Sequence, residues 1–144
     1  MVIGIQCKHT LCKGVNYLRG GHPYVPGLYV PPGKTLVIRG DGTLEAGSNG
    51  YGAGIGGGRS AGMVCGDIVI EGGTIVATGG DGAAGIGSGP LSACGNIVVS
   101  GGSVTATGGD AAAGIGSGVQ GTNGTITVTG GIFLADVGRL GYVF

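Results

Sequence analysis

GDIVIEGGTIVATGGDGAAGIGSGPLSAC, at residues 66–94, is followed at once by GNIVVSGGSVTATGGDAAAGIGSGVQGTN, at residues 95–123. The two stretches are a 29-residue unit written twice, and parts of the unit recur on both sides. Residues 53–58, AGIGGG, match the segment AGIGSG that begins at Ala84 and again at Ala113. A fixed period of this length indicates a solenoid, in which each repeat is one structural unit stacked on the next.

Each unit predicts three short β-strands bent at glycine-rich corners. β-branched residues dominate the first two runs of the unit, where apolar residues alternate with other types. Glycine accounts for 39 of 144 residues, a density that destabilises helices. The glycines do not fall at every third position, which excludes collagen, and periodic aliphatic residues with few charges argue against disorder. We therefore predict an all-β fold, a parallel right-handed β-helix solenoid with about 29 residues and three short strands per coil.

Alternation along each strand assigns its two faces. In the first run, Ile68 and Ile70 should point inward. In the third run, alternation turns Ile86 inward and the flanking glycines outward. Stacked coils then bring equivalent interior residues about 4.8 Å apart. The predicted interior ladders are Ile68–Ile97–Ile126, Ile75–Val104–Phe133, Ala77–Ala106–Ala135 and Ile55–Ile86–Ile115.

The chain is expected to form one domain with three parts. Residues 1–34 are irregular and carry four of the five prolines, so we predict an N-terminal coil that covers the first regular rung. Residues 35–131 hold the regular β-helix repeats. From residue 132 the pattern fades into an apolar tail, and we predict that residues 132–144 form a C-terminal cap.

Composition limits the partners. The chain has 7 basic and 7 acidic residues and no basic patch, which argues against nucleic acid. It has no run of about 20 apolar residues, so we expect no membrane span. The first residues, MVIGIQCKHTLCKG, lack a basic region followed by a sustained apolar run, and we expect no signal peptide there. The residues alone leave the localisation open.

Several strings resemble a glycine-rich β-helix repeat of large bacterial cell-surface proteins. They are VPPGKTLVI at residues 30–38, GAGIGGG at 52–58, GGTIVATGG at 72–80 and AAGIGSG at 83–89. The resemblance covers about residues 28–131. It implies an extracellular module of carbohydrate-binding or adhesin-like type, and it supplies no catalytic residues.

Alternate glycines of the third run form the first candidate binding or packing face. The strip consists of Gly54, Gly56, Gly85, Gly87, Gly114 and Gly116. A bare backbone strip admits close approach of a second protomer, a loop of this chain or a sugar ring. The alternative is that glycine only permits tight bending here. Among outside partners, self-association is favoured over a sugar, because the repeats offer few aromatic side chains.

A row of hydroxyl side chains on stacked strands forms the second candidate face. Thr74, Val76 and Thr78 should stack on the equivalent residues of the next coil, which include Thr107. A regular threonine array is typical of ice-binding solenoids, but Val76 interrupts this one. Threonine is also an ordinary exposed strand residue, and we keep Thr78 and Thr107 as candidate contact residues.

Among the seven carboxylates, Asp81 and Asp110 share one repeat position and should be neighbours at a corner. Such a pair would hold Ca²⁺ only weakly. Each follows Gly-Gly, where aspartate favours tight turns, so we predict no metal site and no cofactor. The outward positions carry no dense group of acids and bases, and the sequence favours a non-enzymatic protein.

Two of the four cysteines, Cys65 and Cys94, are repeat-equivalent. Their α-carbons should lie close enough for a disulfide, although stacked free thiols filling a corner fit equally well. Cys7 and Cys12 lie on either side of His9, but a single pair with this spacing is a weak zinc signal.

We therefore expect a structural or adhesion-type solenoid that presents flat glycine and threonine faces for self-association or for binding a glycan. The alternative function is a carbohydrate-active β-helix enzyme, such as a polysaccharide lyase or hydrolase, or a fragment of one. Fold alone does not separate the two.

Overall fold

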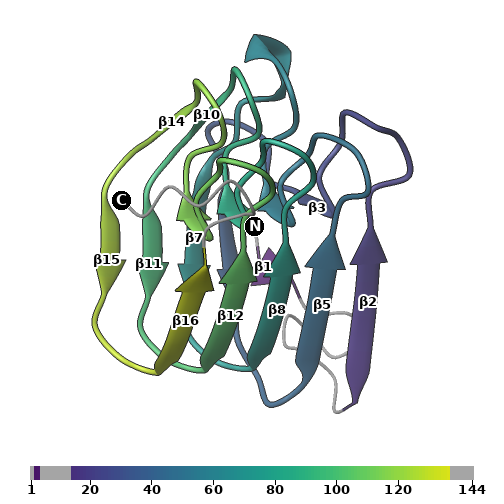
Figure 1. The fold of residues 1–144 in the computed structure, drawn as a ribbon. Helices are drawn as coiled ribbons and strands as arrows, with labels where there is room; N and C mark the ends of the chain where they lie inside the picture. The colour runs from purple at the N-terminus through teal and green to yellow at the C-terminus, as the bar shows by residue number, and fades with distance from the viewer. Residues whose placement is uncertain (1, 4–13, 137–144) are drawn as a thin grey trace.

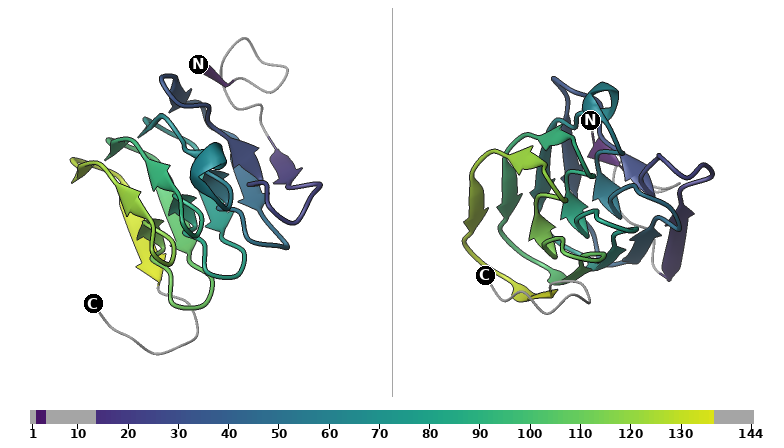
Figure 2. Two further views of the ribbon diagram at one scale, coloured as in Figure 1. Left: turned by 90° about the horizontal axis from the view of Figure 1, so that it is seen from above. Right: turned by 45° about the horizontal axis from the view of Figure 1, so that its top comes forward.

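A computed structural model describes residues 2–3 and 14–136. The chain winds into a parallel β-solenoid, and every strand pairing in the described part is parallel. Figure 1 shows the coils as successive rungs, from the purple N-terminal end to the yellow C-terminal end. The two turned views of Figure 2 show the same rungs stacked along one axis. No α-helix occurs among the described residues.

Three long sheets and one short one run along the solenoid. In spatial order the first sheet contains β1 (Val2–Ile3), β4 (Thr35–Ile38), β7 (Asp67–Ile70), β11 (Ile97–Val99) and β15 (Ile126–Val128). The second contains β16 (Ile132–Asp136), β12 (Ser103–Thr107), β8 (Thr74–Thr78), β5 (Thr43–Gly47) and β2 (Val15–Arg19). The third contains β13 (Ile115–Gly116), β9 (Ile86–Gly87), β6 (Ile55–Gly56) and β3 (Leu28–Tyr29), and the short sheet pairs β10 (Ala93–Cys94) with β14 (Thr122–Asn123).

The strand register confirms the residue pairings of the four predicted ladders, but the last members of three of them, Ile126, Phe133 and Ala135, are exposed at the C-terminal end. Ile97 pairs with Ile68 on one side and with Ile126 on the other, a step of 29 residues each time. Val104, Ala106 and Ile86 occupy the corresponding central places of the other three ladders. The period of the sequence is therefore the length of one coil.

The core is a column of aliphatic side chains inside the coils. Ile68, Ile75, Ile86 and Ile97 are fully buried, while Val69 on the opposite face of its strand is half-buried. Burying an aliphatic side chain of this size contributes about 1.5–3 kcal/mol. The isoleucine and valine ladders add this contribution at each interior coil, which helps a chain with so much glycine to fold.

The prediction that the third-run glycines face outward is wrong. All six are buried, namely Gly54, Gly56, Gly85, Gly87, Gly114 and Gly116. Strand alternation stops in this run because β9 is only two residues long and Gly87 has φ of 135°, a conformation open to glycine and strained for other residues. A Cβ on Gly85 would lie 2.7 Å from the carbonyl oxygen of Gly114, and one on Gly87 would collide with that of Gly116. The strip therefore packs against the neighbouring coils of the same chain and presents no open face.

The corner after the third sheet has an unusual backbone in every coil. Ser60, Leu91 and Gln120 hold the same repeat position, with φ of 96°, 56° and 54°. In the first of these coils the corner is two residues longer than in the next and contains a short 3₁₀ helix, η1 (Ala61–Met63). All three positive-φ side chains are exposed, so this corner turns side chains toward solvent.

The two ends of the solenoid differ. At the N-terminal end, β2 and β3 make an irregular coil that pairs with β5 and β6. At the C-terminal end, Ile132, Phe133 and Leu134 of β16 are exposed, Ile132 to 76%. The remainder of the predicted C-terminal cap, residues 137–144, lies outside the described residues, as do Cys7 and Cys12.

Candidate functional site

The candidate site lies where the coils depart from their repeat. Tyr51 stands at the position that is Gly82 in the next coil and Ala111 in the one after. Arg59 stands at the position that is Pro90 in the next coil and Val119 in the one after. Both residues belong to corner loops of the first regular coil, beside the irregular N-terminal coil.

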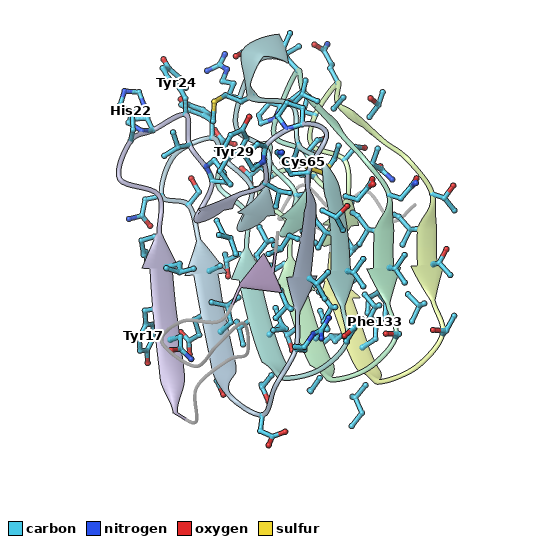
Figure 3. All side chains as sticks on the ribbon, turned by 180° about the vertical axis from the view of Figure 1, so that it is seen from behind. Tyr17, His22, Tyr24, Tyr29, Cys65 and Phe133 are labelled. Atoms are coloured by element: carbon cyan, nitrogen blue, oxygen red, sulfur yellow. A yellow bond between two sulfur atoms is a disulfide. The ribbon has the colours of Figure 1, made fainter. Side chains whose placement is uncertain are left out.

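Tyr51 and Arg59 form one cluster with two residues of that N-terminal coil. The rings of Tyr24 and Tyr51 are stacked with centroids 5.9 Å apart and planes inclined by 24°. The Arg59 guanidinium lies 4.7 Å from the Tyr51 centroid and 5.8 Å from that of Tyr24. His22 lies 5.4 Å from the Tyr24 ring, and Figure 3 shows these two side chains side by side at the loop end of the molecule. Cation–π contacts of this kind contribute about 0.5–1 kcal/mol at exposed sites.

Backbone hydrogen bonds fix the loops that carry the cluster. The Tyr51 amide donates to the Pro23 carbonyl at 2.6 Å, and the Arg59 amide donates to the Tyr24 carbonyl at 3.0 Å. The buried Ser48 adds a side-chain tie, because its hydroxyl donates to the carbonyl of Val25 at 3.0 Å. The cluster is thus preorganised by the main chain as well as by ring contacts.

Three adjoining hollows surround the cluster. Their volumes are about 520, 540 and 520 Å³. The first and second share Tyr51 and Asp81, the second and third share Arg59, and the first and third share His22. Because they share walls, we treat them as one surface, the corner groove, lined by His22, Tyr24, Tyr51, Arg59, Asp81 and Asp110. Each volume falls within the range of small-molecule sites, about 300–1,000 Å³.

The two predicted corner aspartates both line this groove. Asp81 and Asp110 are exposed and lie in successive coils. Both line the second hollow, together with Gln120. Within residues 2–3 and 14–136, no three His, Cys, Asp or Glu side chains are grouped so as to hold a metal ion. Their carboxylate oxygens can accept hydrogen bonds, and each adds a negative charge to the groove.

The predicted threonine face lies on the outer side of the second sheet. Thr78 and Thr107 are paired in register, Thr78 exposed and Thr107 half-buried. Thr78 borders only a small hollow of about 40 Å³ together with Tyr17 and Glu45. The six glycines proposed as the other face are buried between coils, as described above, so they form no exposed surface. The threonine face stays a prediction.

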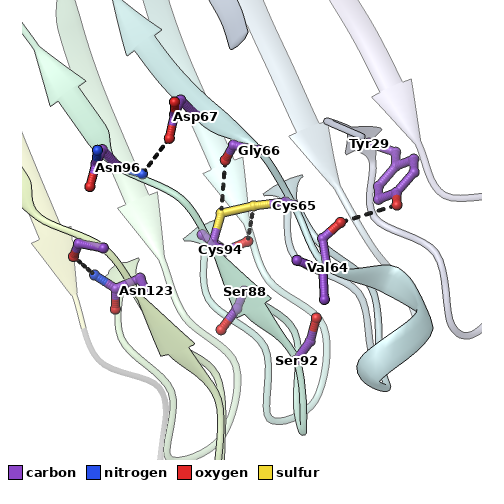
Figure 4. The surroundings of a disulfide bond; sticks show 12 residues. Tyr29, Val64, Cys65, Gly66, Asp67, Ser88, Ser92, Cys94, Asn96 and Asn123 are labelled. Atoms are coloured by element: carbon purple, nitrogen blue, oxygen red, sulfur yellow. Dashed lines mark hydrogen bonds between the residues drawn. A yellow bond between two sulfur atoms is a disulfide. The ribbon is translucent and has the colours of Figure 1, made fainter. Parts of the chain in front are cut away.

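The structure joins Cys65 and Cys94 in a disulfide between successive coils. Their α-carbons lie 4.4 Å apart and both residues are buried. Figure 4 shows the bond beside Gly66, whose carbonyl oxygen lies 3.6 Å from Cys94 Sγ. The bond ties the base of the corner that carries η1 to the next coil.

Comparison with known proteins agrees with this architecture. Three stretches match the family model of the beta helix repeat. The matched residues are 36–59, 68–90 and 97–119. Each begins in the first sheet and ends at the corner after the third, so each match corresponds to one coil. No curated protein and no solved structure matches the chain.

The matches leave out the N-terminal coil that supplies His22 and Tyr24. The beta helix repeat therefore accounts for the frame of the molecule but not for half of the aromatic cluster.

One further finding concerns membranes: in the described part of the chain, no helix has the length and apolar character needed to cross a bilayer.

A repeat alignment contains a signal that could have found the site. Tyr51 and Arg59 are visible as departures from small or apolar residues once the coils are aligned. Their partners His22 and Tyr24 carry no such signal, because they lie in a segment without the repeat.

Proposed function

We propose that this protein is a non-enzymatic, carbohydrate-binding solenoid module whose corner groove holds an oligosaccharide. The observation that carries the proposal is the stacked pair of Tyr24 and Tyr51 with Arg59 beside it, open to hollows of sugar-ligand size. The fold supports a structural or carbohydrate-related module in general. The groove supports the binding of a glycan in particular.

The chemistry of the groove suits a sugar. A pyranose ring offers an apolar C–H face, which packs on aromatic side chains, and an edge of hydroxyl groups, which need hydrogen-bond partners. Tyr51 supplies the aromatic surface in the centre of the groove. Asn49, Asp81 and Gln120 supply acceptors and donors around it. Their arrangement in successive coils follows the axis of the solenoid, so we expect the sugar chain to lie along that axis.

Binding fits the groove better than hydrolysis does. A glycosidase keeps one carboxylic acid protonated in a protected setting while a second carboxylate acts as base or nucleophile. Asp81 and Asp110 are both exposed in an open groove. This exposure favours the binding module over the carbohydrate-active enzyme.

We also propose that the module works outside the cytoplasm. The support is the buried bond between Cys65 and Cys94, because disulfides persist mainly in oxidising compartments. The resemblance to cell-surface repeats points in the same direction.

Titration calorimetry against a panel of neutral and acidic oligosaccharides tests the binding proposal. Replacing Tyr51 by alanine should weaken binding about fivefold or more, because loss of one stacking ring costs roughly 1–3 kcal/mol. Tyr17→Ala is the matched control, since Tyr17 is a tyrosine exposed to 66% on the outer face of the second sheet. Equal losses in the two variants, or a loss in Tyr17→Ala alone, would place the ligand elsewhere. Absence of binding across the panel would reject the function.

A further inference from the structure

We infer that the corner groove selects a saccharide with one acidic sugar at one end, whose carboxylate pairs with Arg59, and with neutral sugars along the rest. This inference rests on the proposed function and specifies its ligand. It follows from a difference between the hollows of the groove, because the third is bordered by Arg59 and has no acidic side chain, whereas the first and second contain aspartates.

Arg59 supplies the positive charge of the groove. Arg59 is half-buried, and its guanidinium lies beside the rings of Tyr24 and Tyr51. None of the described carboxylates lies within ion-pair distance of it, whereas Arg39 is paired with Glu71 at 3.2 Å. Arg59 is therefore a positioned cation whose hydrogen-bond donors remain available to a ligand.

The third hollow, which Arg59 borders, contains no acidic side chain. Its walls are His22, Tyr24, Val25, Arg59, Ser60 and Met63. A planar guanidinium matches a carboxylate with two parallel hydrogen bonds, and the rings of Tyr24 and Tyr51 beside the guanidinium help to hold it in place. A carboxylate on a sugar that stacks against Tyr24 fits this hollow.

The first and second hollows repel a second anion. Asp81 lines both of them and Asp110 lines the second, which Arg59 also borders. The two aspartates belong to the two coils that follow the coil of Arg59, about 5 Å and 10 Å further along the axis from the spacing of stacked strands. Carboxylates accept hydrogen bonds from sugar hydroxyls but disfavour a uronate beside them. The groove thus prefers one acidic sugar at the Arg59 end and uncharged sugars next to the aspartates.

Calorimetry with three oligosaccharides of equal length and linkage tests this inference. One is neutral, one carries a single terminal uronic acid, and one is a uronic acid throughout. We expect the singly acidic ligand to bind about tenfold more tightly than the neutral one, since a charge-assisted pair is roughly twice as strong as a neutral hydrogen bond. The fully acidic ligand should gain less than this, or nothing.

The variants identify the residues responsible. Arg59→Gln should abolish the preference for the singly acidic ligand, measured as the ratio of its affinity to that of the neutral ligand in the same variant, and Arg59→Lys should keep part of the preference. Arg39→Gln removes a cation that is already paired with Glu71 and should leave all three affinities unchanged. Thermal unfolding of each variant checks that it folds. If Arg59→Gln does not fold, the affinities of Arg59→Lys are compared with those of the wild type instead.

The outcomes separate the two proposals. If the neutral and singly acidic ligands bind equally, or if Arg59→Gln keeps the preference, this inference fails and the glycan-binding function stands. Tightest binding of the fully acidic ligand would refute the role of the aspartates. If none of the three ligands binds and the wider panel is also negative, the function fails as well.

Discussion

Gly87→Ala should destabilise the solenoid more than the same change at the equivalent position of the last complete coil. Gly87 and Gly116 share the repeat position and almost the same backbone, with φ of 135° and 138°. Their surroundings differ. A Cβ on Gly87 would collide with the backbone of Gly116, whereas the nearest atoms to a Cβ on Gly116 are side-chain atoms, the first of them Ala113 Cβ at 3.3 Å. The pair therefore separates the cost of coil stacking from the cost of the backbone conformation.

The magnitudes follow from those two contributions. An alanine at this φ costs about 1–3 kcal/mol in either variant. Forcing a methyl group into close-packed backbone adds about 1–3 kcal/mol, and only Gly87→Ala incurs this second cost. Urea unfolding followed by circular dichroism should give a free energy of unfolding for Gly87→Ala that is lower by that difference. Equal losses in the two variants, or a larger loss in Gly116→Ala, would show that the buried glycines do not hold the coils together.

Two further predictions concern the core and the disulfide. Ile75→Ala should lower the free energy of unfolding by about 2–5 kcal/mol, because it leaves a cavity in a fully buried ladder. Val76→Ala, on the outer face of the same strand, should change it by less than about 1 kcal/mol, and similar losses by urea unfolding would contradict the assignment of faces. Replacing Cys65 and Cys94 together by serine should cost about 3–4 kcal/mol, from the loop entropy of a 29-residue separation. Reductant should lower the Tm of the wild type and not that of this double variant, and an unaffected wild type would mean that the two thiols are free or that the bond adds no stability.

The ladders could be predicted from the sequence because two periods agree there. The coil period of 29 residues sets which residues stack, and strand alternation sets which of them face inward. Both periods are intact around Ile68 and Ile75, where β-branched residues keep the chain extended. Nothing outside those stretches was needed to place the core.

The same alternation failed in the third run because glycine does not enforce an extended strand. Gly56 and Gly87 adopt positive φ, so inward and outward directions no longer alternate beyond Ile86. Whether a glycine faces solvent or a neighbouring coil depends on how closely the coils approach, and that distance is a property of the assembled solenoid. A residue without a side chain gives no signal for it in the sequence.

The aromatic cluster was missed for a different reason. Its contacts join loops that are far apart in the chain, and the hydrogen bond from Tyr51 to the Pro23 carbonyl depends on where the irregular coil lies against the first regular one. No periodicity predicts that placement. The only signal of the cluster in the sequence is that Tyr51 and Arg59 differ from the residues at the same repeat positions in the other coils.

That departure gives the groove a direction. Coils with identical corners would offer a ligand the same contacts at every step, and the ligand could bind in any register along the axis. Tyr51 and Arg59 occur in one coil, while Asp81 and Asp110 recur in the two that follow. If the corner groove binds an extended glycan as proposed, the break in the repeat would fix one end of that ligand and its orientation, and the regular coils would extend the same surface toward its other end.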